Sequence, residues 1–455
     1  MKKTYVGDTP TLIGQEVTLY GWVDTKRDHK KIVFIDLRDR SGIVQVVGMD
    51  DLKVLSSGDV VCLRGIVKER PEKLRNPKLA TGNVEIESVE CKLLNKSEPL
   101  PFPIDTDGYE INEEMRLRYR YVDMRRQRLQ RNILFRSKFI RSVRDFLYQE
   151  GFIEIETPLL TKSTPEGSRD FVVPSRMQPG KFYALPQSPQ QYKQLLMGAG
   201  FEKYFQIARC LRDEDLRADR GFEHTQIDLE MSFVERDDVM ALDERMITKV
   251  VESFGYTIKE KPFPVFTYHE AMEKFGADKF DLRTEEDKAN GILAFAWVIN
   301  FPLFEKTDEG GWTFSHNPFS APLPEHREKL LKQEDIGNII STQYDMVCNG
   351  HEVGGGSIRN HESSALRSVF RIMGYDDGTI DVQFGHMLEA FRLGMPPHGG
   401  IAHGIERLLM TILGEDYLRE VVAFPITAGG KTAVMNAPSE LSPAQLRELG
   451  IEVIG

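Results

Sequence analysis

The sequence predicts an α+β protein, with a small N-terminal all-β domain before a larger domain that has an antiparallel sheet flanked by helices. Three observations predict this. Residues 16–95 alternate apolar and polar side chains with the period of two of half-buried strands. A segment rich in proline and acid, 97–107, indicates an extended linker, because proline lacks a backbone donor and restricts its neighbour. Beyond it, helices and strands alternate to residue 430 without a regular βαβ rhythm.

The first region contains five strand-like runs and a hairpin turn at 39–42. These runs are EVTLYGWVD, KIVFIDLRD, IVQVVG, DVVCLRGIVKE and NVEIESVECKLL. The pattern fits a five-stranded barrel of the oligonucleotide-binding type (OB-fold), and it fits a sandwich equally well. After the linker, a helix is expected over NILFRSKFIRSVRDFLYQE, since five apolar residues share one face and Gly151 follows as a stop. These residues are Phe135, Phe139, Val143, Phe146 and Leu147.

Length and composition place the chain in a broad class. A chain of 455 residues, 40% of them hydrophobic, favours two or three domains. We expect a cytoplasmic protein with no membrane segment, because no apolar run reaches about 18 residues and the first residues lack the core of a signal peptide. The four cysteines lie far apart, which predicts neither zinc nor disulfides. The net charge of −11 argues weakly against nucleic acid, although basic residues cluster, notably over 116–131.

Several ordered motifs are more specific than any of these patterns. They are GWVDTKRDHKKIVFIDLRDRSGIVQVV, GFIEIETPLL, PEGSRDFVVPSR, QSPQQYKQLLM, ARCLRDEDLRADRGFEHTQIDLEMSFV, YDMVCNGHEVGGGSIR and GMPPHGGIAHGIERLLM. In these motifs, and over nearly its whole length, the chain resembles the class II aminoacyl-tRNA synthetases, and within them the bacterial-type aspartyl-tRNA synthetases.

The resemblance implies an activity and a domain organisation. The activity is aspartate–tRNA ligation: L-aspartate is activated with ATP and Mg²⁺ to aspartyl-adenylate and transferred to the 3′ end of tRNA-Asp. Whether tRNA-Asn is charged as well stays open. The implied parts are an OB-fold anticodon-binding domain (1–98), a hinge (99–131) and a class II catalytic domain (132–455). A short connector near 281–293 stands where bacterial members carry a large inserted domain, and a homodimer is expected.

The resemblance also assigns residues that bind ATP. Two anions, the aspartate α-carboxylate and the α-phosphate, approach each other only if cations neutralise them, so arginine and Mg²⁺ suit this reaction. Arg212 and Arg407 are implied as the catalytic arginines, and Asp345 and Glu352 as the metal-binding pair. The spacing of these two acids fits one helix face, and it equally fits two facing strands of a hairpin. The implied ATP site comprises Arg212, Asp213, Glu214, Glu223, His224, Glu352, Gly404, Ile405, Glu406 and Arg407.

The resemblance also implies which residues bind aspartate and which contact tRNA. A pocket for aspartate must offer buried positive charge to the β-carboxylate, and Lys193 and Arg359 match the two cations that do so in the family. The implied aspartate site comprises Glu166, Gln190, Lys193, Arg212, Asp228, His316 and Arg359. Arg27, Phe34 and Gln45 match the anticodon readers, with Phe34 offering an aromatic face for stacking. From periodicity alone, Phe34 would be assigned to the core of the barrel.

The chain departs from the family pattern at five positions and leaves two alternatives open. Glycine stands at 221 and histidine at 224, where the family has an ATP-associated glutamine and an adenine-stacking phenylalanine. The other departures are Asn317, His403 and Ile426. One alternative is an asparaginyl-tRNA synthetase, which Lys193 and Arg359 argue against. The other is a non-catalytic tRNA-binding paralogue, which the retained arginines and carboxylates argue against.

Overall fold

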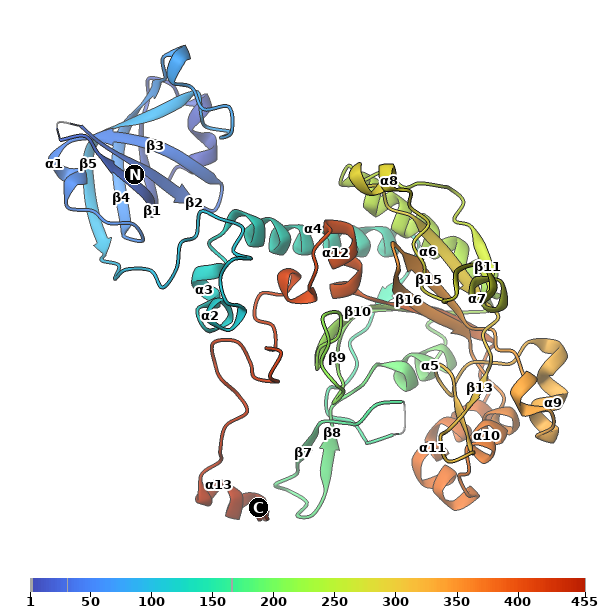
Figure 1. Ribbon diagram of the computed structural model, residues 1–455. Helices are drawn as coiled ribbons and strands as arrows, with labels where there is room; N and C mark the ends of the chain where they lie inside the picture. The colour runs from blue at the N-terminus through green and yellow to red at the C-terminus, as the bar shows by residue number, and fades with distance from the viewer. Residues whose placement is uncertain (1–2, 31, 165–166, 455) are drawn as a thin grey trace. The chain divides into compact units, whose positions relative to one another are not determined.

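The computed structural model describes residues 3–30, 32–164 and 167–454 (Figure 1). The chain divides into two compact units, Met1–Ile111 and Asn112–Gly455. The segment 99–131, expected as one hinge, is therefore divided between them. Its second half forms helices α2 (Glu113–Arg118) and α3 (Arg120–Asp123). Buried ion pairs hold these helices within the second unit, such as Arg116 to Glu420 at 2.9 Å.

The first unit is a closed five-stranded barrel with the strand order β1-β2-β3-β5-β4, as the OB-fold interpretation expected. Strands β3 and β5 pair in parallel, and the other pairs are antiparallel. Closure removes the edges that a sandwich would leave exposed. The elements of this unit are η1 (Val6–Thr11), β1 (Glu16–Asp28), β2 (Val33–Asp39), β3 (Gly42–Gly48), α1 (Asp50–Lys53), β4 (Val60–Glu69), η2 (Glu72–Leu74) and β5 (Val84–Asn95).

Strand β2 shows which face of the barrel each residue occupies. Val33, Ile35 and Leu37 are fully buried in the barrel interior. Phe34 alternates with them, so its side chain lies on the outer face and is only half-buried. The interpretation of Phe34 as a core residue is therefore wrong.

The second unit is built around an eight-stranded sheet with the order β11-β12-β15-β16-β17-β10-β9-β6. Its strands are β6 (Ile153–Glu154), β9 (Lys203–Leu211), β10 (Glu223–Ser232), β11 (Val265–Thr267), β12 (Phe295–Ile299), β15 (Tyr344–Cys348), β16 (His351–Ile358) and β17 (His398–Gly404). Neighbouring strands from β12 to β9 are antiparallel. The short edge strands β11 and β6 pair in parallel, so the sheet is antiparallel in its centre, as expected, and mixed at its two edges.

Helices surround this sheet, and two small hairpins complete the unit. The hairpins pair β7 (Val172–Pro174) with β8 (Phe182–Ala184), and β13 (Phe304–Lys306) with β14 (Trp312–Phe314). The remaining elements are α4 (Gln127–Gln149), α5 (Gln190–Gly198), α6 (Arg236–Ser253), α7 (Tyr268–Phe275), α8 (Glu285–Ala289), η3 (Pro324–His326), α9 (Arg327–Lys332), η4 (Ile336–Asn338), α10 (Ser363–Ile372), α11 (Asp377–Arg392), α12 (Ile405–Leu413), η5 (Leu418–Val421) and α13 (Pro443–Leu449). None of the helices over the described residues is long and apolar enough to cross a membrane.

Strand β10 separates an apolar face of the sheet from a polar one. Ile227, Leu229 and Met231 join the main core with side chains of α4, α6 and α12. Asp228 and Glu230 alternate with them and so point to the opposite face, where both are almost fully buried. Because buried carboxylates need partners, this second face must carry cations or bind a ligand.

The glycine triplet of β16 allows the strands around this polar face to pack closely. A Cβ atom at Gly356 would lie 2.2 Å from the carbonyl oxygen of Gly400 on β17. At Gly354 it would lie 2.4 Å from the ring of His403. Larger side chains are therefore excluded where β16 meets β17.

We predict that Gly356→Ala lowers the free energy of unfolding by about 1–3 kcal/mol, the usual range for overpacking. Backbone lines the contact, so no flexible side chain can move aside. Urea unfolding followed by circular dichroism measures the change. Gly404→Ala is the matched control for stability, since no described atom lies within 4 Å of its added Cβ. Equal stability of the two variants would contradict the packing argument.

Candidate active site

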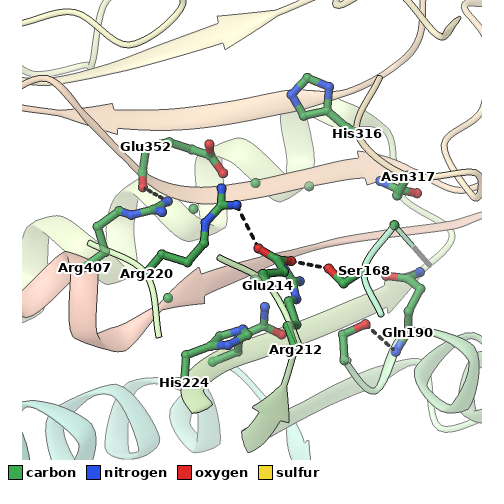
Figure 2. A pocket seen from close by; sticks show the side chains of 18 of the residues that line it. Ser168, Gln190, Arg212, Glu214, Arg220, His224, His316, Asn317, Glu352 and Arg407 are labelled. Atoms are coloured by element: carbon green, nitrogen blue, oxygen red, sulfur yellow. Dashed lines mark hydrogen bonds and ion pairs between the residues drawn. The ribbon is translucent and has the colours of Figure 1, made fainter. Parts of the chain in front are cut away.

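A cavity of about 960 Å³ opens on the polar face of the sheet (Figure 2). Side chains from α5, the loop after β9, β10, the loop after β14, β16, β17 and α12 line it. It brings together 14 of the residues implied for aspartate and ATP. These are Gln190, Lys193, Arg212, Asp213, Glu214, Glu223, His224, Asp228, His316, Glu352, Arg359, Gly404, Glu406 and Arg407.

At one end of the cavity, two buried cations converge on one carboxylate. Arg359 forms a bidentate pair with Glu230, with distances of 2.8 Å from Nε and 3.0 Å from one terminal nitrogen. Lys193 Nζ lies 3.2 Å from the same carboxylate and 2.6 Å from Asp228. All four side chains are at most 3% exposed. This end therefore contains a desolvated cluster of two cations and two anions.

The cluster keeps donors and acceptors that its own members do not use. Arg359 has five N–H groups, of which bonds to Glu230, Ser357 and Gly400 use four. Oδ2 of Asp228 is buried without a hydrogen-bond partner among the described residues. Burial raises the pKa of Asp228, which Lys193 opposes. Although burial also disfavours charge on Glu230, Arg359 and Lys193 hold its pKa down at about 2.

The other end of the cavity carries the arginines expected beside the phosphates. Arg212 follows β9, and Arg407 lies in the first turn of α12. Nε of each is buried without a hydrogen-bond partner among the residues the structure describes. Arg407 donates to the backbone carbonyl of Glu352 at 3.1 Å, as Figure 2 shows. Unpaired guanidinium nitrogens in a cavity are suited to bind an anion.

His224 lines the same cavity as these arginines and is half-buried. Burial, together with the positive charges of Arg212, Arg407 and Arg209, lowers its pKa to about 3. The imidazole is therefore neutral at physiological pH. A neutral ring can stack on a purine base without repelling the neighbouring guanidinium groups.

The acidic residues at this end of the cavity have partners within the protein. Glu214 pairs with Arg220 at 2.8 Å and accepts a hydrogen bond from Ser168 (Figure 2). Glu406 accepts from the backbone N–H of Thr225 at 2.9 Å, so it fixes the start of β10. Ile405 does not line the cavity, because its side chain is buried in the main core.

Asp345 and Glu352 lie on the neighbouring strands β15 and β16, so the hairpin alternative is correct and the helix alternative is wrong. Glu352 lines the cavity, whereas Asp345 is 2% exposed and lies behind it. His316 Nε2 is 3.3 Å from Asp345 Oδ2. That oxygen has no well-aligned hydrogen bond to any described residue, so the contact is ionic. Burial and Glu352 raise the pKa of Asp345.

The outer face of the barrel carries a separate groove of about 790 Å³. Arg27, Phe34 and Gln45, the three residues implied as anticodon readers, all line this groove. Arg27 donates to Asp36 at 3.0 Å and to Gln45 at 3.3 Å, while the ring of His29 meets Phe34 edge-on. The groove thus combines an exposed aromatic face with polar groups that keep one another oriented.

One predicted residue cannot be placed, and two residues of the site were missed. Glu166 lies outside the described residues. Glu230 was missed although it stands two positions after Asp228 on a strand, a spacing that puts both on the same face. Lys279 lines the cavity and pairs with Glu352 at 2.8 Å. No local pattern indicates this contact, because the two residues are far apart in sequence.

The departures at His403 and Asn317 have structural partners. His403 is fully buried away from the cavity, where Nε2 pairs with Asp243 at 2.8 Å and Nδ1 lies 2.9 Å from the Val353 carbonyl. Asn317 lines the cavity and accepts from the backbone N–H of Phe319 at 3.0 Å. A buried acid and a backbone carbonyl therefore satisfy the polar atoms of His403, at the position where the family is expected to have phenylalanine.

Sequence profiles and solved structures agree with this fold. Residues 112–428 match the family described as tRNA synthetases class II (D, K and N), and residues 17–91 match the OB-fold nucleic acid binding domain. The chain therefore belongs to the class II tRNA synthetases, a family of enzymes. Within this class it belongs with the aspartate–tRNA ligases, as full-length relatives show.

An aspartate–tRNA(Asp/Asn) ligase of Thermodesulfovibrio yellowstonii is 39% identical, with 97% of each chain covered. An aspartate–tRNA ligase of Staphylococcus saprophyticus is 37% identical, with 99% of each covered. The first alignment runs over 579 positions although this chain has 455 residues, so the relative carries segments that are absent here.

Among solved structures, a putative aspartyl-tRNA synthetase from Leishmania major has a TM-score of 0.76 at 19% identity, covering 93% of this chain and 94% of that one. Asparaginyl-tRNA synthetase from Pyrococcus horikoshii, complexed with asparaginyl-adenylate, has a TM-score of 0.72 at 23% identity, covering 93% and 98%. At these identities the likeness concerns the fold.

Proposed function

We propose that this protein activates L-aspartate with ATP and transfers the aspartyl group to tRNA-Asp. The observation that carries the choice of amino acid is the convergence of Lys193 and Arg359 on Glu230 beside the unsatisfied oxygen of Asp228. An α-ammonium group on Asp228 and a β-carboxylate on the two cations would use the donors and acceptors that the cluster leaves free.

Charge balance favours aspartate over asparagine in this cluster. With Arg212, which is proposed below to contact the α-carboxylate of aspartate, the cluster of Lys193, Arg359, Asp228 and Glu230 has three positive charges and two negative ones. Aspartate as it binds carries one net negative charge, so the group becomes neutral. Asparagine carries none and would leave one buried positive charge uncompensated, which is unfavourable in a desolvated site.

For adenylate formation, we propose that Arg212 contacts both the α-carboxylate of aspartate and the α-phosphate of ATP. Its place in the wall of the cavity and its Nε, which has no hydrogen-bond partner among the described residues, support this role. Arg407 would hold the terminal phosphates, and His224 would stack on adenine. The arginines thereby reduce the repulsion between the attacking carboxylate and the phosphate.

Mg²⁺ is proposed to bind at Asp345 and Glu352. The residues fit the ion: carboxylate oxygens are hard ligands, Asp345 Oδ2 lacks a hydrogen-bond partner among the described residues, and Glu352 faces the cavity. No group of three or more His, Cys, Asp or Glu side chains in the described chain could hold a metal alone. Two carboxylates suit Mg²⁺, which commonly completes its shell with substrate phosphates and water and there neutralises phosphate charge.

ATP–pyrophosphate exchange driven by L-aspartate or L-asparagine tests this proposal. We expect aspartate to be preferred by at least about a hundredfold in kcat/KM, because a misplaced buried charge costs about 3–5 kcal/mol. Faster exchange with asparagine would identify an asparaginyl enzyme. Absence of exchange with both would support a non-catalytic tRNA-binding protein. Charging of purified tRNA-Asp and tRNA-Asn would then define the tRNA scope.

The groove on the barrel is proposed to bind the anticodon of tRNA. We predict that Phe34→Ala raises the KM for tRNA about tenfold, since stacking on an aromatic ring contributes about 1–3 kcal/mol per base. Adenylate formation should be unchanged. Aminoacylation and ATP–pyrophosphate exchange, measured side by side, separate the two effects. Tyr20→Ala, on an exposed aromatic of the barrel outside the groove, is the control. Equal losses in both assays would exclude an anticodon role.

We also propose a cytoplasmic homodimer. Leu159 and Leu160 are each 52% exposed and Ile153 is 45% exposed, beside the edge strand β6 of the large sheet. Exposed apolar side chains at a sheet edge favour association with another chain. Sedimentation equilibrium would test the dimer.

The four free cysteines are compatible with the proposed cytoplasmic location, which is a reducing compartment.

A further inference from the structure

Lys279 enters the cavity from a chain segment that contributes no other residue to its wall. It follows α7 by four positions, and its Nζ lies 2.8 Å from Glu352 Oε2. This is the only ion pair of Lys279 within the described chain. The lysine side chain is 47% exposed and that of Glu352 is 27% exposed. The ammonium group is therefore held at one point and has solvent-filled space around it.

The pair differs from an ordinary surface ion pair in its surroundings. Glu352 is one of two neighbouring carboxylates, and each has its own cation: Lys279 on Glu352, and His316 on Asp345. Arg407 binds the backbone carbonyl of Glu352 at 3.1 Å. Figure 2 shows Glu352 on the wall of the cavity, with Arg220, Arg407 and His316 around it. Lys279 thus neutralises a carboxylate that faces the polyphosphate end of the cavity.

A divalent cation bound to Glu352 would weaken the ion pair between Glu352 and Lys279. Lys279 contacts Oε2 of Glu352, and a metal ion bound to that carboxylate would lie close to the ammonium group and repel it. The lysine side chain has a flexible four-carbon stem and is half-exposed, so the ammonium group can move while the helices and strands stay folded. The nearest new anion would be the polyphosphate that enters with the metal.

We propose that Lys279 is a substrate-positioning residue that acts as the counter-ion of Glu352 before the nucleotide binds and then as a ligand of its β- and γ-phosphates. This proposal rests on the assignment of ATP to the cavity. It adds a cation to the arginines and lysine already placed there, and it identifies the leaving pyrophosphate as the group that Lys279 contacts.

The test uses the full-length protein and the variant Lys279→Met, which keeps the length of the stem and removes the charge. Mn²⁺ binding without nucleotide, followed by electron paramagnetic resonance, should become at least threefold tighter, because Lys279 no longer competes for Glu352. Binding of a non-hydrolysable ATP analogue at fixed Mg²⁺, and of pyrophosphate, should weaken about tenfold. The KM for aspartate should change less than twofold.

Two further variants separate positioning from folding. Lys288→Met is the matched control, because Lys288 is 43% exposed and pairs with Glu285 outside the cavity; it should match the wild type in every assay. Lys279→Arg should restore analogue binding to within threefold. Thermal unfolding of all variants confirms that they are folded.

Unchanged Mn²⁺ affinity or unchanged analogue affinity in Lys279→Met would overturn the proposal, as would equal effects in Lys288→Met. These binding assays do not require aspartate. If the wild type failed to catalyse aspartate-dependent exchange but Lys279→Met still altered Mn²⁺ and pyrophosphate binding, the proposed function would fail while the role of Lys279 would stand.

Discussion

Replacing Arg359 with leucine should reduce aspartate-dependent ATP–pyrophosphate exchange on the order of a thousandfold while leaving ATP binding nearly intact. Arg359 is 2% exposed, and its remaining N–H group is the donor proposed for the β-carboxylate. Its loss would leave that carboxylate desolvated beside Lys193 alone, and breaking a buried ion pair costs about 3–5 kcal/mol. The effect should fall on kcat/KM for aspartate, measured by exchange kinetics.

The same substitution also leaves Glu230 without its bidentate partner, so loss of activity alone would be ambiguous. The double variant Arg359→Leu/Glu230→Gln removes both charges and should recover stability but not activity. Arg371→Leu removes an exposed arginine that pairs with Asp377 and should change neither. Titration with an ATP analogue confirms that the nucleotide end is intact. Near wild-type aspartate activation in a folded Arg359→Leu variant would refute the assignment of aspartate to this pocket.

The sequence alone predicts strands and helices well where the periodicity is clear, as in β10 and α4. It does not distinguish the barrel core from its outer face in the run Val33-Phe34-Ile35, where every residue is apolar. Only closure of the barrel determines that Phe34 points outward. Alternation also carries no information on strand direction, which is why the parallel edge strands β6 and β11 were not expected.

The site residues were predicted from the order of the motifs along the chain, and no local pattern indicates them. Arg212, Glu352 and Arg407 come from three distant segments, and composition gives no sign of their convergence. The net charge of −11 even suggests the opposite of an anion-binding cavity. Contacts such as Lys279 with Glu352 depend on how the loop after α7 folds back over the hairpin of β15 and β16. Long-range packing of this kind leaves no periodic signal.

The burial of Asp345 is a further feature that the motif does not indicate. The motif indicates Asp345 and Glu352 together, and it does not indicate that Asp345 is the more deeply buried of the two, against His316 and Gln343. Burial and the neighbouring Glu352 raise its pKa, and His316 opposes this shift. Glu352 is in the opposite situation, since Lys279, Arg407 and His316 lower its pKa against the effect of burial. Glu352 is therefore the more readily charged of the two carboxylates.

Arg212→Ala should lower the rate constant of adenylate formation by about 10²- to 10³-fold, the usual effect of removing one donor that stabilises charge in a transition state. Rapid-quench measurement of adenylate formation under saturating substrates isolates this step. Binding of aspartate should weaken far less, because Lys193 and Arg359 remain. Arg212→Lys keeps the charge but loses the planar pair of donors that can contact carboxylate and phosphate together.

The lysine variant should therefore recover at most a small part of the rate. Arg245→Ala, on an exposed arginine of α6 paired with Glu150, is the control for a lost surface charge. If Arg212→Lys were as fast as the wild type, positive charge alone would suffice, and the bridging geometry proposed for Arg212 would be wrong. If Arg212→Ala changed substrate binding as strongly as the rate, Arg212 would act in the ground state and not on the charge that develops during transfer.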